Sequence, residues 1–311
     1  MIINELKALL GKDVFLPFSN ELVGVDLDKK NFKTIDKKEA SRIACIDGGC
    51  LTIADGGSWI ISKIRIGTVE YDGLKKTRQE AKEYYLIIVQ KEKYEVVALD
   101  NNVPINLKLR GVDSCKIEEL ASKIMKYFEW QECLNQKTDS LILMDSALNA
   151  ETEFEKELVD KVLEKKISVI GFCKTSRIRT INGRSLLGVV NSISPKKTAW
   201  FYYPIFENEK IIKSFIAKLD DSSKFCYKVE LPNYSNPEKI FSILRFFSKD
   251  SEMPGYPYPL FKADKLARIN SFEKKKELYN IENELKKNDL FFDALSNSFH
   301  SELDNRMYRK Q

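Results

Sequence analysis

The chain has 311 residues, of which 43% are hydrophobic and 31% are charged. This composition predicts a globular fold and excludes an intrinsically disordered chain, which would contain far fewer apolar residues. No run of eighteen apolar residues occurs, and the first thirteen residues lack the basic region and cleavage site of a signal peptide, so we expect neither a membrane span nor secretion.

The cysteines indicate the cellular compartment of the protein, and the distribution of charge bears on its partners. The six cysteines are scattered without a Cys-x-x-Cys pair, which is typical of the reducing cytoplasm. The net charge of +5 is too small to indicate a nucleic-acid partner by itself. Residues 161–190, however, carry seven Lys or Arg against one Glu. This stretch is either a solvated basic face or part of a nucleic-acid-binding surface.

Residues 1–40 predict a short amphipathic helix and a connection rich in Lys and Asp. The following stretch, 43–67, contains Asp-Gly-Gly twice, at 47–49 and 55–57. Asp-Gly and Gly-Gly pairs tolerate the positive φ angles of tight turns. We therefore predict three antiparallel strands at about 43–47, 50–54 and 58–66, with Asp55 serving only a turn. Residues 84–90 and 94–100 predict another strand pair.

The middle of the chain predicts a β-α-β unit. Residues 113–134 first show the 3.6-residue spacing of an amphipathic helix. Two unbroken apolar runs, 141–145 and 167–174, then flank a helical pattern at 151–165, as expected for strands buried on both faces. The crossover makes these strands parallel, so Asp145 and Lys174 at their ends are expected at one edge of the sheet, where ligand sites of open α/β sheets lie.

Further strands are predicted through 198–205, 210–219 and 224–231, followed by helices over 238–248 and 256–269. The tail from residue 271 reads as helical. Its apolar stripe is expected to face the core, with a dimer mate or another partner as the alternative: Phe291, Phe292, Leu295 and Phe299. Together these elements predict an α/β fold with a mixed sheet, in which an antiparallel meander precedes a parallel unit with flanking helices.

Four acidic positions end or border elements that meet at this edge: Asp47, Asp145, a glutamate of the 113–134 helix, and Asp264. Carboxylate oxygens are the ligands that Mg²⁺ and Mn²⁺ prefer. Two such ions about 4 Å apart activate a water and stabilise the leaving oxygen of a phosphodiester. Any one of these acids alone is more simply a cap, turn or surface residue, so the metal hypothesis depends on their shared location.

Five segments resemble the NurA nucleases in sequence and order: ACIDGG (44–49), FEWQECL (128–134), LILMDSAL (141–148), VIGFCKTSRI (169–178) and GYPYPLFKADKLARI (255–269). The resemblance implies one domain: a ribonuclease H-like core at 41–270, preceded by an N-terminal helix and connection (1–40) and followed by a helical tail (271–311). It also implies a homodimer that uses Mn²⁺ or Mg²⁺, as two ions, to cleave single- and double-stranded DNA, in the cytoplasm that the cysteine usage indicates. Its implied activities are 5′–3′ exonuclease and single-strand endonuclease, and its implied role is DNA-end processing for recombinational repair with a HerA-type hexameric translocase.

The resemblance also implies roles for single residues. Asp47 and Asp145 match the metal ligands of the first strand and of the central parallel strand. Glu129 matches the helix ligand, although Glu132 lies nearer the apolar face and stays as the alternative. Asp264 takes a metal-ligand position that the family often fills with histidine.

Two further residues receive roles from the resemblance. Tyr256, the tyrosine of the Tyr-Pro-x-Pro-Leu box, would orient the scissile phosphate or a water. Lys174 would hold a phosphate oxygen or offset charge; its alternative is a strand-end lysine in solvent.

The chain departs from the family at three places. Asp-Gly-Ser is replaced by Asp-Gly-Gly at 47–49 and by Asp-Ser-Ala at 145–147, and histidine is replaced by Asp264. An acid remains at each place, which favours a metal-dependent nuclease. The missing histidine removes a candidate general base, so a catalytically weakened DNA-binding or adaptor subunit of the translocase complex is the alternative function.

Overall fold

The computed structural model describes residues 26–294, except 102, 106, 108, 113–114, 137–139, 181–182 and 208, together with the backbone of residues 15–16. The helix predicted at the N-terminus, and Leu295 and Phe299 of the apolar stripe, lie outside these residues.

Seven strands precede the first long helix of the described chain, and three helices follow its last strand. The strands are β1 (Phe15–Leu16), β2 (Phe32–Thr34), β3 (Arg42–Asp55), β4 (Trp59–Asp72), β5 (Lys75–Gln90), β6 (Tyr94–Asp100), β7 (Val103–Ile105), β8 (Leu141–Met144), β9 (Val169–Cys173), β10 (Arg179–Thr180), β11 (Trp200–Tyr202), β12 (Ile212–Lys218) and β13 (Tyr227–Pro232). The helices are the 3₁₀ turn η1 (Lys29–Asn31), α2 (Ile117–Asn135), α3 (Glu153–Glu164), α4 (Leu186–Ile193), α5 (Pro237–Phe247), α6 (Tyr258–Ala267) and α7 (Ser271–Lys287).

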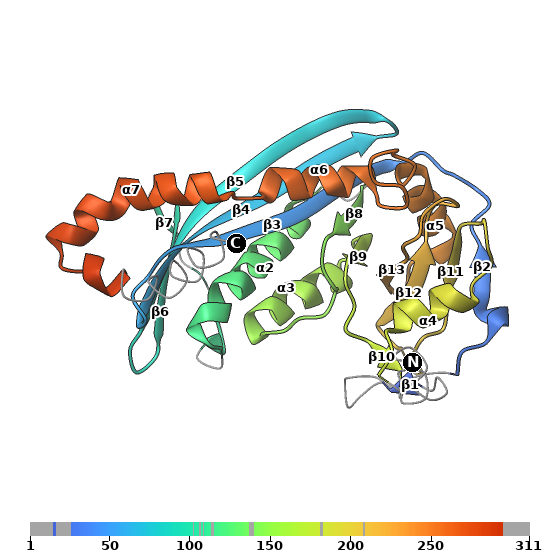
Figure 1. Cartoon of the computed structure of the whole chain (residues 1–311), viewed down its shortest axis with the longest axis horizontal. Helices are drawn as coiled ribbons and strands as arrows, with labels where there is room; N and C mark the ends of the chain where they lie inside the picture. Colours follow the sequence, from blue (N-terminus) through green and yellow to red (C-terminus); the bar gives the residue numbers. More distant parts are fainter. Residues whose placement is uncertain are drawn as a thin grey trace, which may run out of the picture.

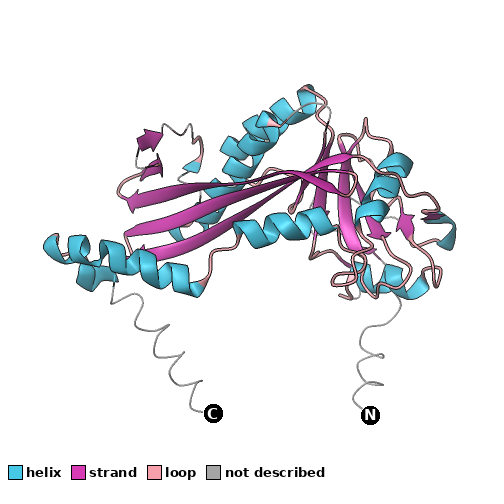
Figure 2. Cartoon of the chain, turned by 90° about the horizontal axis from the view of Figure 1, so that it is seen from above, coloured by secondary structure: helices cyan, strands magenta, loops and turns pink. Residues whose placement is uncertain are grey.

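Eleven of the described strands form one mixed sheet in the order β2-β11-β12-β13-β9-β8-β3-β4-β5-β6-β7, while β1 pairs with β10 separately. β8 is parallel to both β3 and β9, and the other neighbours in the sheet are antiparallel. The long strands β3, β4 and β5 extend well beyond the short strands beside them (Figures 1 and 2). The prediction of an antiparallel meander followed by a parallel β-α-β unit is confirmed.

Helices cover both faces of the sheet (Figure 1). On one face, α2 and α3 pack on the central strands and α4 packs on β11 and β12. On the other, α5 and α6 pack on the central strands and α7 packs near the β3–β4 hairpin. Burial of these two apolar layers against the sheet is the main stabilising contribution. No helix in the described part of the chain is long and apolar enough to cross a membrane.

The first Asp-Gly-Gly triplet is not a turn, so the predicted strands at 43–47 and 50–54 were wrong. β3 continues through residues 47–49 and pairs antiparallel with β4 along this length. The second triplet does form the hairpin turn: Gly57 has a φ of 81°, and its N–H donates to Asp55 Oδ1 at 2.8 Å. The glycines of the first triplet instead allow α2 and α6 to pack closely on β3.

The C-terminal stripe is only partly buried. Phe291 packs against a cluster that includes Leu285 of α7 and Ala54 of β3, whereas Phe292 is exposed. α7 itself begins with a capping box, in which Asn270 and Glu273 bond to each other's backbone N–H groups. The expectation that the whole stripe faces the core was therefore wrong at Phe292.

Candidate metal centre

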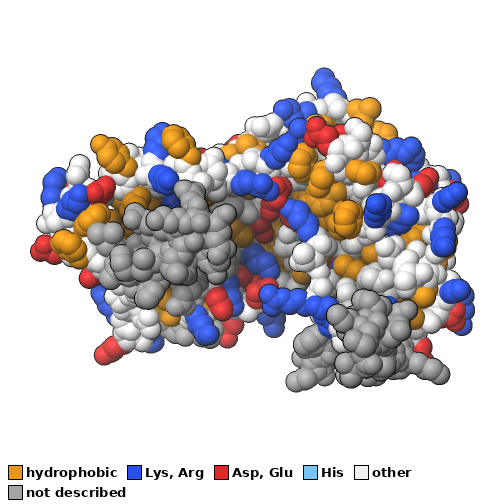
Figure 3. All heavy atoms as spheres, viewed as in Figure 1, with side chains coloured by type: hydrophobic (Ala, Val, Ile, Leu, Met, Phe, Trp, Pro, Cys, Tyr) orange, Lys and Arg blue, Asp and Glu red, His pale blue; other side chains and the backbone are white. Residues whose placement is uncertain are grey.

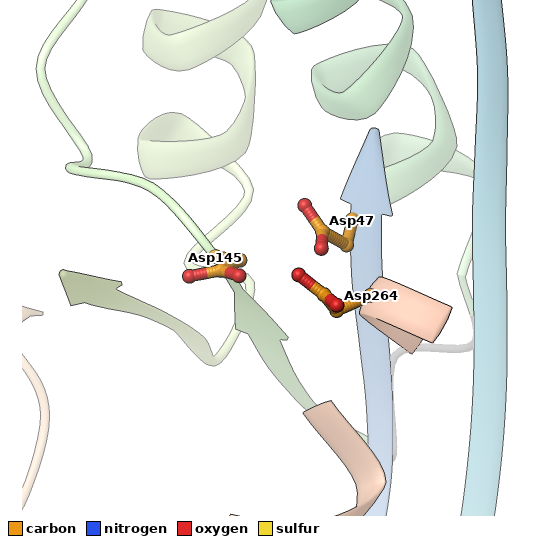
Figure 4. A group of neighbouring side chains, drawn as sticks. All are labelled: Asp47, Asp145 and Asp264. Atoms are coloured by element: carbon orange, nitrogen blue, oxygen red, sulfur yellow. The ribbon is translucent and has the colours of Figure 1, made fainter. Parts of the chain in front are cut away.

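Three carboxylates converge where β8 ends beside β3 (Figure 4). Asp47 lies on β3, Asp145 directly follows β8, and Asp264 lies on α6. One carboxylate oxygen from each residue lies within 4.8 Å of those of the other two. Asp47 and Asp145 are brought together by the parallel pairing of β3 and β8, in which the preceding residues, Ile46 and Met144, are partners.

Glycines on β3 and β4 allow α6 to lie directly on the sheet. A Cβ atom at Gly49 would lie 2.1 Å from the carbonyl oxygen of Ala267, and one at Gly67 would lie 2.8 Å from that of Ala263. Gly67 is also the partner of Asp47 in the β3–β4 pairing. Gly49 is therefore required for the close approach of the helix that carries the third acid, and not for a turn.

Gly48 allows a similar approach from α2 on the opposite face. A Cβ atom there would lie 2.6 Å from Glu129 Oε1. Glu129 thus lies against the strand beside Asp47, although it is outside the group of three mutually close carboxylates. Its Oε2 atom is buried and has no hydrogen-bond partner among the described residues. A buried carboxylate oxygen without a donor is a candidate ligand atom.

Glu132, the alternative helix ligand, is engaged elsewhere. Its carboxylate accepts hydrogen bonds from Lys82 Nζ and Gln136 Nε2, each at 2.6 Å, and from Thr68 Oγ1 at 3.3 Å. These partners fix it against β4 and β5. Of the two glutamates, Glu129 therefore lies against β3 next to Asp47, whereas Glu132 is held at β4 and β5.

Lys174 and Tyr256 also contact the acids; the shared sheet edge predicts this for Lys174, and the family resemblance implies it for Tyr256. The Lys174 ammonium forms an ion pair with Asp145 and lies 2.7 Å from Asp264 Oδ1. The buried Tyr256 hydroxyl donates to Asp145 Oδ2 at 3.4 Å. Arg268 Nη2 makes a second ion pair with Asp264 at 2.9 Å. Lys174 is thus part of the acidic cluster, in contrast to the alternative of a lysine free in solvent.

Burial and mutual repulsion disfavour the charged forms of the inner acids. Burial, together with the charges of Asp145 and Glu129, raises the pKa of Asp47 to about 9. Burial likewise raises the pKa of Glu129 to about 8, and it raises the pKa of Asp145 despite the nearby Lys174. Burial acts in the same direction on Asp264, but hydrogen bonding and charge from Lys174 outweigh it and hold that pKa below its ordinary value.

This donor set fits a divalent cation. Crowded, buried carboxylates are costly to ionise, and a bound cation reverses that cost by favouring the charged forms. Asp47, Asp145 and Asp264 supply the hard oxygen ligands that Mg²⁺ and Mn²⁺ prefer. The buried Oε2 of Glu129, which has no hydrogen-bond partner among the described residues, is a further candidate oxygen ligand.

Two residues that sequence reasoning missed fix the loop after β8. Glu230 of β13 is buried, and its Oε2 accepts a hydrogen bond from the Leu148 N–H at 2.6 Å. Its partner in β9 is Gly171, where a Cβ atom would lie 2.7 Å from the Ser146 carbonyl oxygen. Together they set the path of the chain that starts at Asp145. A glycine inside an apolar strand signals such close approach, whereas a single strand glutamate gives no comparable signal.

Comparisons with known proteins agree with this fold. The family model of the NurA domain matches residues 41–269. No curated protein matches the chain. A crystal structure of NurA superposes with a TM-score of 0.50 at 11% identity, covering 85% of this chain and 93% of that one. A crystal structure of NurA with manganese gives 0.50 at 11% identity, with 84% and 92% covered.

Human endonuclease V gives a lower TM-score of 0.41 at 9% identity, with 80% and 94% of the two chains covered. At such identities, the NurA superpositions show the fold alone, which is α/β with a mixed parallel and antiparallel sheet. The match to the NurA domain, however, covers most of the chain. The chain therefore belongs to the NurA family of metal-dependent nucleases.

Proposed function

We propose that the chain is a divalent-metal-dependent deoxyribonuclease that processes DNA ends for recombinational repair together with a HerA-type hexameric translocase. The observation that carries the metal-dependent nuclease activity is the convergence of Asp47, Asp145 and Asp264, with carboxylate oxygens within 4.8 Å of one another. The role in DNA-end processing and the translocase partner are proposed from membership of the NurA family. We propose Mn²⁺ as the bound ion because a NurA structure of this fold contains manganese. Mg²⁺ has the same preference for oxygen ligands.

Within this proposal, the three aspartates hold two metal ions and Glu129 supplies an additional oxygen. When bound, such ions supply an activated water and stabilise the leaving oxygen of a phosphodiester. Lys174, which already contacts two of the acids, donates to a phosphate oxygen of the DNA strand. Tyr256, fixed against Asp145, orients that phosphate.

The proposal extends to the family's wider properties: action as a cytoplasmic homodimer on single- and double-stranded DNA, with 5′–3′ exonuclease and single-strand endonuclease activities. A DNA partner is supported by the basic residues of 161–190, of which six are exposed and one is half-buried. Exposed Lys and Arg side chains bind DNA phosphates and release counterions, so we expect salt-sensitive binding.

The proposal is tested by measuring cleavage of labelled single- and double-stranded DNA in Mn²⁺. Asp47→Asn and Asp145→Asn should each lower the rate by at least about 100-fold, since each removes a carboxylate ligand of the ions that stabilise the leaving oxygen. Asp55→Asn is the matched control, because it alters the other Asp-Gly-Gly triplet about 25 Å along the strand. Mn²⁺ should also raise the melting temperature of the parent more than that of the two site variants.

Parent-like cleavage by both site variants would show that the site is wrongly assigned. A parent protein that binds DNA in a salt-sensitive manner, but cuts none in Mn²⁺ or Mg²⁺, would identify the chain as the weakened adaptor subunit.

A further inference from the structure

The corner between α6 and α7 is fastened to the sheet close to the candidate metal centre. Residues 268–270 join the two helices, which follow one another along the long strands β3 to β5 (Figures 1 and 2). Because α6 carries Asp264, the position of this corner affects the position of the third acid. Gly49 and Gly67 give α6 room to approach the sheet, but a glycine has no side chain that could hold the helix there.

Arg65 of β4 supplies the bonds that the glycines lack. Its Nη1 donates to the carbonyl oxygen of Arg268 at 3.0 Å, and its Nη2 donates to Glu273 Oε1 at 2.6 Å. Arg268 is the C-cap residue of α6, and Glu273 belongs to the capping box that begins α7. One guanidinium group therefore binds the end of one helix and the start of the next.

The strand register explains why this arginine reaches the corner. Arg65 is the partner of Gly49 in the β3–β4 pairing, and it precedes Gly67 by two residues. Alternate residues of a strand share a face, so Arg65 is on the same face of β4 as Gly67, which lies beneath Ala263 of α6. Arg65 is therefore one step further along the helix, at its carboxyl end.

The guanidinium group of Arg65 is itself held in place. Lys and Arg side chains are spread over the face of the molecule seen in Figure 3, and ion pairs between such exposed charges contribute little. The Arg65 side chain, in contrast, is only 13% exposed. Its Nε donates to Glu83 Oε1 of β5 at 2.6 Å, so each of its three nitrogens has an acceptor. The planar group is thus fixed in one orientation.

Arg268 connects the corner to the metal centre. Its backbone N–H donates to the carbonyl oxygen of Asp264 at 3.0 Å, and its Nη2 pairs with Asp264 Oδ2 at 2.9 Å. The Arg268 side chain is 71% exposed, so this pair keeps one geometry only if the backbone of Arg268 is fixed. Arg65 fixes it by binding the carbonyl group of the same residue.

We propose that Arg65 is a positioning residue for the metal centre: it fixes Arg268, and through it holds the Asp264 carboxylate where a divalent cation binds. This rests on the metal-dependent activity proposed above. The hydrogen bonds of Arg65 within the described part of the chain go to Glu83, Arg268 and Glu273, so it acts on the cation only through α6.

The test is titration of the DNA-free protein with Mn²⁺, in which electron paramagnetic resonance measures the free ion. Arg65→Met should weaken Mn²⁺ binding by about 10- to 100-fold, the usual effect of losing a residue that orients a metal ligand. Arg65→Met/Glu273→Gln is the second variant, because it also removes the charge that loss of the guanidinium leaves unpaired. Glutamine still completes the capping box, so this variant should fold and show the same weakened binding.

Lys63→Met is the matched control from the same group of ion pairs. Lys63 is 5% exposed and pairs with Glu83 and with Glu277 of α7, each at 2.9 Å, so it fastens α7 and not α6. Urea unfolding of the metal-free proteins should show that Lys63→Met and Arg65→Met are both less stable than the parent. Only Arg65→Met should bind Mn²⁺ more weakly.

Asp264→Asn shows whether Arg65 acts through this acid. Adding Arg65→Met to Asp264→Asn should weaken Mn²⁺ binding by less than about 2-fold, because both changes affect the same ligand. Parent-like Mn²⁺ affinity of both Arg65 variants, an equal loss in Lys63→Met, or a full loss in the Asp264→Asn background would overturn the positioning role alone. A parent that binds no Mn²⁺ would overturn the proposed function and the positioning role together.

Discussion

Replacing Gly49 with alanine is expected to push α6 away from the sheet and to separate Asp264 from the other two acids. The new Cβ atom would lie 2.1 Å from the Ala267 carbonyl oxygen, whereas ordinary contacts begin at 3.4 Å, so the helix must withdraw by about 1.3 Å. The obstacle is backbone and cannot rotate aside. Overpacking of this kind costs about 1–3 kcal/mol, and a misplacement of about 1 Å lowers the rate by about 100-fold.

The assay for Gly49→Ala combines Mn²⁺-dependent cleavage with urea unfolding of the metal-free protein. Gly188→Ala is the matched control: its Cβ atom would approach nothing closer than 3.8 Å, and alanine within a helix is favoured by about 1 kcal/mol. Gly48→Ala tests the other face of the sheet, where the new Cβ atom meets the Glu129 and Met125 side chains and no helix backbone. Because side chains can move aside, this variant should lose less stability than Gly49→Ala. Parent-like cleavage and stability of Gly49→Ala would refute the view that this contact positions Asp264.

Two further predictions concern protons and the loop after β8. Because Asp47 and Glu129 have pKa values raised to about 9 and 8, the metal-free folded protein binds more protons than the unfolded chain above about pH 4. In EDTA, the melting temperature of the parent should therefore decrease as the pH rises from 6 to 8.5. The melting temperature of Asp47→Asn should depend less on pH over the same range. A parent whose stability rises with pH over this range contradicts the raised pKa values. In Glu230→Gln the amide oxygen can still accept the hydrogen bond from the Leu148 N–H, so this variant should keep most of its activity. Glu230→Leu has no acceptor, so it should weaken the apparent Mn²⁺ affinity by about 10-fold with little change in DNA affinity. Equal Mn²⁺ affinity of the two Glu230 variants would show that this bond does not position Asp145.

The parts of the fold that sequence reasoning predicted correctly are those set by local patterns. Unbroken apolar runs and a helical period specify β8, α3 and β9, and the crossover through the helix makes the two strands parallel. That is sufficient to place Asp145 and Lys174 at one edge, where they form an ion pair. The helix at α2 and the strands β11 to β13 follow from periodicity in the same way.

The parts that could not be predicted depend on contacts between distant segments. Asp-Gly-Gly at 47–49 has the composition of a turn, and only the packing of α2 and α6 on Gly48 and Gly49 reveals why the strand continues. A helical wheel favours Glu132 for the inner face, but it does not show that Lys82 and Thr68 engage this side chain.

The most direct test of the central claim is anomalous diffraction at the manganese edge from crystals of the protein grown with Mn²⁺. We expect two manganese peaks among the carboxylates of Asp47, Asp145 and Asp264. Manganese bound only at other acidic residues, with no peak at this edge of the sheet, would contradict this claim.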